Sequence, residues 1–302
     1  MSGDLFLLAF DHRRSLMRSF FDVEGEPTPE RVAQAGLLKR VIWQGLERAV
    51  SDGLRGDDAG VLVDPTYGFD VIRAGRAAGV RVAVPLEESG RERFAFEAEG
   101  WRERLDELDP TWAKVLVRYH PRAEPASNER QRDALRDVSE HCRRTGRGFM
   151  FELLVPPTPD DLASVAGDRA RYDREVRPGL VVDAIRELRT AGVEPGVWKL
   201  EGLNRSEDCE AVAAAARGGG RDDVSCVVLG RGAGLDAVGR WLRVAAPIDG
   251  FDGFAVGRSI WWDPMRAFFD AGASEEAADA ASSEIAGRYL GLVDVFTAAR
   301  AG

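Results

Sequence analysis

The stretch GVWKLEGL, residues 196–203, places a lysine and a glutamate inside a run that is otherwise apolar. Short apolar runs recur along the chain, rich in Val, Leu and Phe and nearly continuous rather than alternating. Such runs are typical of strands that are buried on both faces of a parallel sheet. The predicted strands cover residues 5–11, 59–64, 80–86, 113–119, 148–155, 197–203, 225–230 and 253–261.

Segments with apolar residues three and four apart lie between these runs and predict helices. Eight strands that alternate with helices predict a (β/α)8 TIM barrel, with residues 1–302 as a single domain. The alternative is a doubly wound open sheet, but no G-x-G-x-x-G motif follows the first strand. Residues 156–178 read as an enlarged strand-to-helix loop. The predicted helices cover residues 28–50, 128–146, 179–192, 206–220, 235–247 and 274–299.

The composition excludes several classes of function. The chain has a net charge of −10, which argues against a nucleic acid or an anionic membrane as partner. No run reaches the ~18 consecutive apolar residues of a membrane span. Three scattered cysteines form neither a disulfide framework nor a zinc pattern, so we expect a cytoplasmic protein. With only three histidines and no paired-His motif, we predict no metal cofactor, and a carboxylate-held magnesium ion stays the alternative.

Polar residues enter or follow the predicted strands at their C-terminal ends, where the active site of a barrel lies. We therefore take these residues as the candidates for a site. They are Asp11, His12, Arg13, Asp64, Glu87, Glu88, Lys114, Arg118, Glu152, Lys199, Glu201 and the turns around Arg231 and Arg258.

Lysine is scarce: of the 41 Lys and Arg residues only three are lysines, Lys39, Lys114 and Lys199. Lys39 falls in a predicted helix, and we expect it to be solvated. Lys114 and Lys199 fall in predicted strands, where a buried ammonium is costly unless it is paired or loses its proton. A lysine can lose that proton and an arginine cannot.

The pattern alone leaves three interpretations of Lys199. As a neutral amine, favoured by a second positive charge at Lys114, it would attack a carbonyl and form a Schiff base. As a cation it would form a structural ion pair with Glu201, which shares its face of the strand, or contact a substrate phosphate.

Two further carboxylates have open roles. Glu152, in the apolar run FMFELLV, is either a salt-bridge partner of Lys114 or Lys199, or a general acid/base that serves the amine. Asp11 is either a metal ligand or a group that binds a substrate hydroxyl.

The last two predicted strands end in glycine-arginine sequences, at the usual phosphate-binding end of a barrel. Gly230, Gly232 and Gly257 would let backbone N–H groups approach an anion. Arg231 and Arg258 would add charge-assisted hydrogen bonds, the alternative for each being a surface ion pair.

Longer strings distributed over nearly the whole chain carry a family resemblance. They are LFLLAFDHRRSL (5–16), AKVLVRYHP (113–121), FELLVPPTPDDL (151–162), RYDREVRPGL (171–180), GVEPGVWKLEGL (192–203), DCEAV (208–212), VVLGRGA (227–233) and GFAVGRSIWWDP (253–264). They resemble the 2-deoxy-5-keto-gluconate-6-phosphate aldolase domain often fused to the myo-inositol-pathway sugar kinase. More distantly, the chain is similar to the tagatose-1,6-bisphosphate and sulfosugar-phosphate aldolases, which are class I Schiff-base barrels.

The resemblance implies roles for matching residues. Lys199 would form the Schiff base, Lys114, Glu152 and Asp11 would serve the same site, and Gly257 with Arg258 would bind phosphate. Since no kinase half is present, we expect a stand-alone domain.

The resemblance also implies a function, the reversible cleavage of 2-deoxy-5-keto-gluconate 6-phosphate to dihydroxyacetone phosphate and malonate semialdehyde. Arg13 or Arg118 would hold the substrate carboxylate. The alternatives are an aldolase for a tagatose, fructose or sulfosugar phosphate, and a non-catalytic phosphosugar-binding domain. We expect a homo-oligomer whose partner is a small sugar phosphate, without a cofactor.

Overall fold

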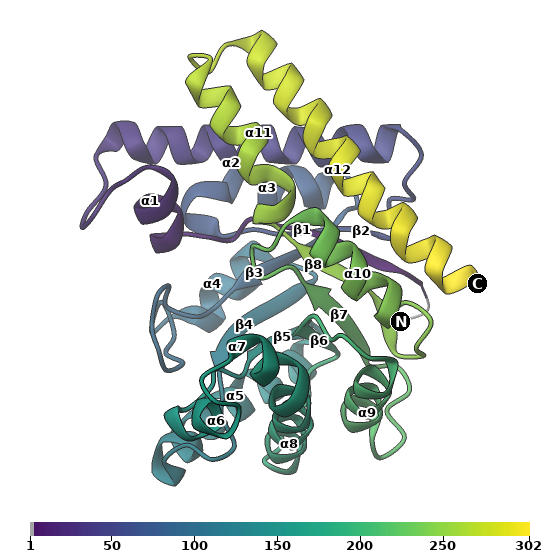
Figure 1. The fold of residues 1–302 in the computed structure, drawn as a ribbon. Helices are drawn as coiled ribbons and strands as arrows, with labels where there is room; N and C mark the ends of the chain where they lie inside the picture. The colour runs from purple at the N-terminus through teal and green to yellow at the C-terminus, as the bar shows by residue number, and fades with distance from the viewer. Residues whose placement is uncertain (1–2) are drawn as a thin grey trace.

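The computed structural model describes residues 3–302, and its eight strands form one closed parallel barrel in chain order (Figure 1). Because β8 returns to pair with β1, the predicted (β/α)8 TIM barrel is confirmed and the open sheet is wrong. The strands are β1 (Leu5–Ala9), β2 (Ala59–Leu62), β3 (Arg81–Pro85), β4 (Trp112–Arg118), β5 (Gly148–Leu154), β6 (Val197–Glu201), β7 (Ser225–Leu229) and β8 (Phe251–Val256).

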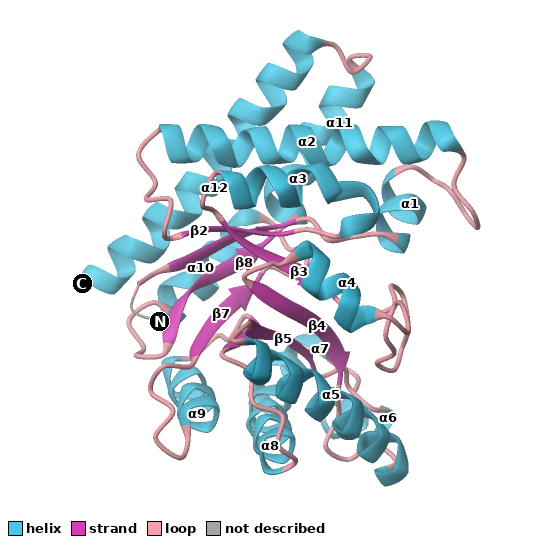
Figure 2. Ribbon diagram, turned by 180° about the vertical axis from the view of Figure 1, so that it is seen from behind, coloured by secondary structure: helices cyan, strands magenta, loops and turns pink. Residues whose placement is uncertain are grey.

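The helices lie around the outside of the strands (Figure 2). Thr28 is the N-cap of α2, because its side chain accepts a hydrogen bond from the backbone N–H of Arg31. The helices are α1 (Arg14–Phe20), α2 (Pro29–Ser51), α3 (Pro65–Ala77), α4 (Trp101–Leu108), α5 (Pro125–Thr145), α6 (Pro159–Ser164), α7 (Arg169–Arg171), the π-helix η1 (Tyr172–Val176), α8 (Arg177–Thr190), α9 (Ser206–Arg217), α10 (Leu235–Ala245), α11 (Arg258–Asp270) and α12 (Glu275–Ala301).

One predicted boundary is wrong near the C-terminus. The strand predicted over 253–261 ends at Val256, Gly257 is the N-cap of a helix, and Arg258 is the first residue of α11. The apolar run continues from the strand into the buried face of the helix, and hydrophobicity alone does not separate the two. Arg258 thereby lies at a helix N-terminus instead of inside a strand.

The C-terminal helices add a layer to one side of the barrel, where α12 packs across α2 (Figures 1 and 2). The crossing is close at Gly45, where a Cβ atom would lie 2.4 Å from Cγ2 of Ile285. Within residues 3–302 no helix has the length and apolar character needed to span a membrane.

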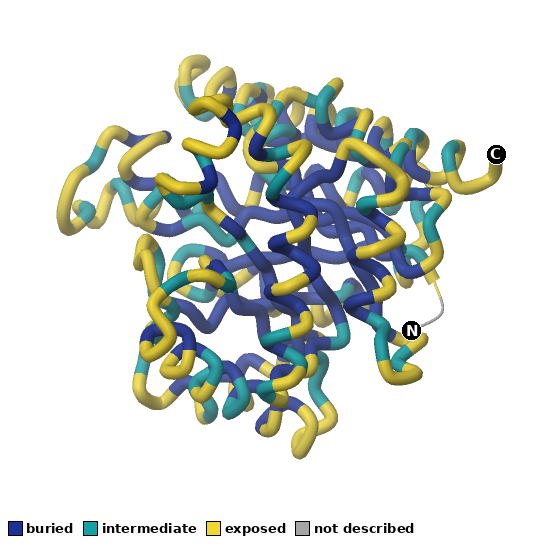
Figure 3. The backbone as a smooth tube through the Cα atoms, turned by 60° about the horizontal axis from the view of Figure 1, so that its bottom comes forward, coloured by how far each residue is buried: buried dark blue, intermediate teal, exposed yellow. Residues whose placement is uncertain are grey.

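Alternate residues of each strand face the two sides of the barrel wall, so the apolar side chains divide into two clusters. The larger cluster lies between strands and helices, and burial is concentrated on the strands (Figure 3). The smaller cluster lies inside the barrel. It contains Leu5, Leu7, Ala9, Leu62, Ala83, Trp112, Met150, Val197, Val227 and Ala255.

Candidate active site

Inside the barrel, charged side chains follow this apolar cluster along the strands. Lys114 follows Trp112 by two residues, and Lys199 follows Val197 by two, so both point to the same side as those apolar residues. Glu152 and Lys199 are paired in register across β5 and β6. The strand geometry therefore brings these predicted residues together inside the barrel.

Lys114 is fully buried, and its ammonium contacts three carboxylates. Its Nζ lies 2.9 Å from Oδ2 of Asp11, 2.8 Å from Oε1 of Glu87 and 2.9 Å from Oε2 of Glu152. Burial opposes the charged amine, but the three carboxylates outweigh it and raise the pKa of Lys114 above its usual range. With an acceptor for each of its three donors, Lys114 is a fixed cation.

Lys199 has a different environment although it is also buried. Its Nζ lies 3.0 Å from Oε2 of Glu152, and no other polar partner of this amine is found among residues 3–302. An ammonium has three donors, so Lys199 keeps capacity that Lys114 has used. Lys199 is therefore the less constrained of the two amines.

The three carboxyl groups around Lys114 differ in proton affinity. Burial opposes ionisation of each, yet Lys114 and Lys199 together hold the pKa values of Asp11 and Glu152 below their usual ranges. At Glu87 burial prevails over Lys114 and Arg13, and it raises the pKa. Glu87 therefore holds a proton more readily than Asp11 or Glu152 does.

The cluster lies at the base of a cavity with a volume of about 280 Å³. Arg13 contributes to its wall and donates to the backbone oxygen of Glu87 at 2.8 Å. Arg118 donates to the backbone oxygen of Arg91 at 3.0 Å. The cavity is rich in arginine, and those that line it are Arg13, Arg18, Arg91, Arg93 and Arg118. An anionic ligand would meet positive charge at this opening.

The loops after β7 and β8 shape a second cavity of about 570 Å³, lined by Gly232, Arg258 and Ser259 among others. A Cβ atom on Gly232 would lie 3.1 Å from Cζ of Arg258, so the missing side chain admits the guanidinium. A Cβ atom on Gly257 would meet the backbone oxygen of Ala9 at 2.0 Å, which explains glycine there. Gly230 packs against Val256.

Arg231 and Glu201 belong to a separate ring of four charges. Arg231 lies 3.0 Å from Glu201 and 2.9 Å from Asp173, while Arg177 lies 3.8 Å from Glu201 and 3.0 Å from Asp173. The ring connects the enlarged loop after β5 to β6 and to the loop after β7. The structure thus places Glu201 beside arginines, and Lys199 takes Glu152 as its partner.

Lys39 corrects the expectation of a solvated side chain, since it is only 1% exposed. Its Nζ donates to Oδ2 of Asp64 at 2.5 Å, to the backbone oxygen of His12 at 3.0 Å and to that of Phe10. Helical periodicity does not reveal these contacts, because the two carbonyl groups belong to residues that follow β1 in the chain.

Glu87 and His12 lie in the site, although no specific role was predicted for either from the sequence. Glu87 follows β3 by two residues, so the same period-two count that placed Lys114 would have placed it inside. His12 lines the same cavity as Lys199. Its ring packs edge-on against Trp261, with 5.6 Å between the ring centroids. Burial lowers the pKa of His12 to about 3, which keeps the imidazole neutral.

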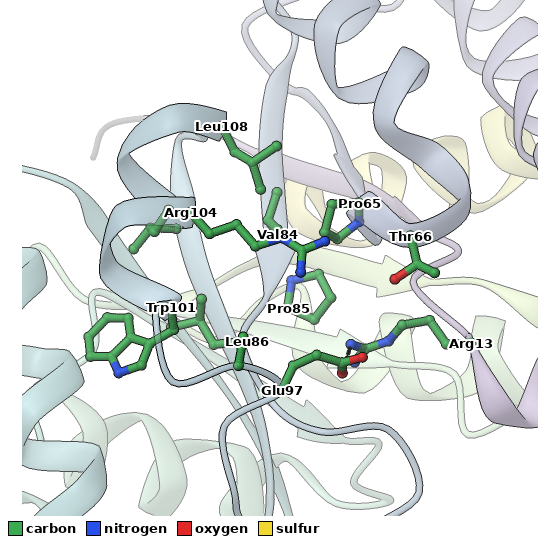
Figure 4. A pocket seen from close by; sticks show the side chains of 12 residues that line it. Arg13, Pro65, Thr66, Val84, Pro85, Leu86, Glu97, Trp101, Arg104 and Leu108 are labelled. Atoms are coloured by element: carbon green, nitrogen blue, oxygen red, sulfur yellow. Dashed lines mark hydrogen bonds and ion pairs between the residues drawn. The ribbon is translucent and has the colours of Figure 1, made fainter.

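A smaller cavity lies outside the barrel wall between β3 and α4 (Figure 4). Arg13 and Glu97 point toward each other at its edge and form an ion pair. Across residues 3–302, no group of three His, Cys, Asp or Glu side chains is arranged to hold a metal ion.

Solved structures with the same barrel include several aldolases. A Plasmodium falciparum fructose-bisphosphate aldolase has a TM-score of 0.65 and 12% identity, covering 98% of this chain and 91% of its own. An archaeal fructose-1,6-bisphosphate aldolase has a TM-score of 0.55 and 14% identity, with coverages of 97% and 94%. The protein Cgl0159 from Corynebacterium glutamicum has a TM-score of 0.58 and 19% identity, with coverages of 94% and 85%. At these identities the likeness shows the fold.

No curated protein gives a significant match to the sequence. A family model matches residues 1–300, nearly the whole chain, and is described as "Uncharacterized protein conserved in bacteria (DUF2090)". The chain therefore belongs to this family of bacterial proteins.

Proposed function

We propose that the protein is a class I aldolase that cleaves a phosphorylated keto sugar through a Schiff base on Lys199. The observation that carries this proposal is the contrast between two neighbouring buried lysines. Both line the cavity, but Lys114 is held by three carboxylates, whereas Lys199 has one partner. Among the structural neighbours, the archaeal aldolase has its catalytic lysine covalently bound to a carbinolamine intermediate.

The site supplies the groups that this chemistry needs. The neutral amine of Lys199 adds to the ketone, and the carbinolamine loses water to give an iminium ion. Glu152, 3.0 Å from that nitrogen, takes the proton of the β-hydroxyl as the carbon–carbon bond breaks. The bonding electrons move into the iminium and form an enamine. Lys114 keeps Glu152 ionised, so its carboxylate is free to accept that proton.

The favoured substrate is 2-deoxy-5-keto-gluconate 6-phosphate, cleaved between C3 and C4 to dihydroxyacetone phosphate and malonate semialdehyde. Arg118 and Arg13, which line the same cavity as Lys199, would bind the substrate carboxylate. Arg258, without a carboxylate partner in residues 3–302, suits the phosphate together with Gly232 and Gly257. Arg231 and Gly230 would serve this end too, although Arg231 must first leave its ring of charges.

Trapping with borohydride tests the proposal. The protein is incubated with a panel of keto-sugar phosphates, namely the favoured substrate and tagatose, fructose and sulfosugar phosphates, and adducts are located by mass spectrometry. We expect a reduced adduct on Lys199 that EDTA does not affect and that Lys199→Arg abolishes. Lys39→Arg, outside the site, is the matched control and keeps the adduct. If no ketose phosphate gives an adduct, the proposal is wrong.

A further inference from the structure

The segment between β3 and α4, residues 86–97, doubles back on itself and forms a hairpin beside the cavity that holds Lys199. The backbone N–H of Glu88 donates to the backbone oxygen of Ala95 at 2.8 Å. Glu87 and Phe96 pair as an antiparallel bridge. The tip of this hairpin contributes to the wall of the cavity, so side chains of the tip can reach a ligand there.

Contacts with two other elements fix the tip of the hairpin. Arg118, the last residue of β4, donates to the backbone oxygen of Arg91 at 3.0 Å. The backbone N–H of Phe94 donates to Oε1 of Gln131, a buried residue of α5, at 3.0 Å. Arg93 lies between these two positions, so its backbone is held in place before any ligand binds. A binding group that is already positioned loses less conformational entropy when the ligand arrives.

Arg91 and Arg93 both line the cavity, but their side chains differ in their partners. Nε of Arg91 lies 2.7 Å from Oε2 of Glu88 and forms an ion pair with it. Across residues 3–302, the Arg93 side chain has no ion pair or hydrogen bond, and Arg118 has no carboxylate partner. These two guanidinium groups therefore keep the donors that a carboxylate or a phosphate would accept from.

The charges of the cavity are divided between its base and its mouth. At the base, three carboxyl groups face two lysines, so no surplus of positive charge is available there to an anion. Arg13 also lines the cavity, but it is paired with Glu97 (Figure 4). At the mouth, the charges of Arg93 and Arg118 are not offset by such partners. An anionic group of a ligand is therefore attracted to the mouth, while a neutral carbonyl group can lie beside Lys199.

The mouth arginines lie across the barrel from the proposed phosphate site. Arg118 ends β4, whereas Arg258 follows β8. In a closed barrel with eight strands in chain order, β4 and β8 are on opposite sides. A ligand with an anionic group at each end would meet an arginine at both ends, with its ketone in the interior between them.

We propose that Arg93 is a specificity-determining residue, which together with Arg118 binds a second anionic group of the substrate. That group, a carboxylate or a phosphate, lies at the end of the substrate remote from the phosphate bound near Arg258. The inference rests on the proposed function, from which it takes the ketose phosphate, and it narrows the substrate class to ketose phosphates with two anionic ends. A ketose with a single phosphate would leave Arg93 without a partner.

Calorimetric binding of two pairs of ligands tests the proposal. One pair is 2-deoxy-5-keto-gluconate 6-phosphate and the analogue whose carboxylate is reduced to an alcohol. The other pair is tagatose 1,6-bisphosphate and tagatose 1-phosphate. All proteins carry Lys199→Met, so that a bound ligand is not turned over. This parent protein should bind the doubly anionic member of at least one pair more tightly, and the pair that shows the preference identifies the second group as carboxylate or phosphate.

Adding Arg93→Gln should weaken binding of the doubly anionic member by about tenfold and leave the other member unchanged. Arg93→Lys should recover part of the loss, because lysine keeps the charge but not the planar pair of donors. Since the Arg93 side chain has no partner in the folded protein, the midpoint of thermal unfolding should not change. Arg104→Gln is the matched control, because Arg104 is an exposed arginine of α4 that lines the cavity outside the barrel wall.

Two results would overturn the proposal. One is equal binding of both members of each pair by the parent protein, and the other is a preference that survives in Arg93→Gln or is lost equally in Arg104→Gln. Failure of the proposed function gives a different result. If the preference depends on Arg93 but borohydride traps no adduct on Lys199 in wild type, the role of Lys199 is wrong and the anion subsite remains.

Discussion

Two buried lysines, Lys39 and Lys199, have different surroundings, and only Lys199 is proposed to be chemically reactive. Lys39 donates to a carboxylate and to two backbone carbonyl groups, so its three donors are all used. Lys199 has a single partner, Glu152, and borders a cavity. Burial alone therefore does not identify a reactive amine. The number of acceptors around the nitrogen separates the two.

The largest effect is expected at Lys199. Lys199→Met should lower the rate of ketose phosphate cleavage by ~10³-fold or more, because the nucleophile is removed. Glu152 keeps Lys114 as its partner, so the free energy of unfolding should change little. Steady-state kinetics and urea denaturation measure the two effects. Substantial remaining turnover would remove the distinction between Lys199 and Lys39.

Lys114→Met should destabilise the protein by about 3–5 kcal/mol at neutral pH, because three buried carboxyl groups lose their shared cation. In wild type the lowered pKa values of Asp11 and Glu152 contribute stability above their ordinary values of 3.8 and 4.5. That contribution is lost as the pH falls through the lowered pKa values. The deficit of the variant should therefore shrink in acid, as denaturation at several pH values would show. A pH-independent deficit would contradict this explanation.

Lys39→Met should also cost about 3 kcal/mol of stability, because Asp64 is left buried without its cation. Adding Asp64→Asn should recover part of the loss, since Asn also caps helices and Asp64 accepts from the N–H of Tyr67. Adduct formation on Lys199 should persist in the double variant. If Lys39→Met instead removes the adduct and leaves stability unchanged, the two lysines have been assigned the wrong way round.

The smallest effects are expected at Arg258 and Arg231. Arg258→Gln should raise the KM for a phosphorylated ketose by about 10–100-fold, because it removes a charge-assisted hydrogen bond. Arg231→Gln should raise the KM less, because Arg231 already pairs with Glu201 and Asp173. The Arg231 side chain is 36% exposed. Loss of its ion pairs should therefore lower the free energy of unfolding by less than about 1 kcal/mol. If the two variants raise the KM equally, Arg231 must leave its ion pairs readily when the substrate binds.

The sequence predicted the features that follow from short periodicities. Eight nearly continuous apolar runs predicted the barrel, and period two predicted that Lys199 and Glu201 share one face of their strand. The start of α11 was missed because strand and helix share one apolar run across Gly257.

Features that depend on packing between distant segments could not be predicted in the same way. The partners of Lys39 come from the segment that follows β1 and from Asp64. The ring of charges around Arg231 depends on Asp173, which lies in the enlarged loop after β5. The sequence does not reveal the path of that loop. The roles of the individual site residues stay predictions until the variants are measured.

The burial of every lysine has a consequence for chemical modification. Between residues 3 and 302, no lysine side chain is on the surface, and the exposed positive charge is carried by guanidinium groups. Reagents that label primary amines, and reducing sugars that glycate them, would find few targets on the outside of this protein. Lys199, at the base of an open cavity, is the side-chain amine best placed to meet them. Amine-directed labelling should therefore report on the site itself.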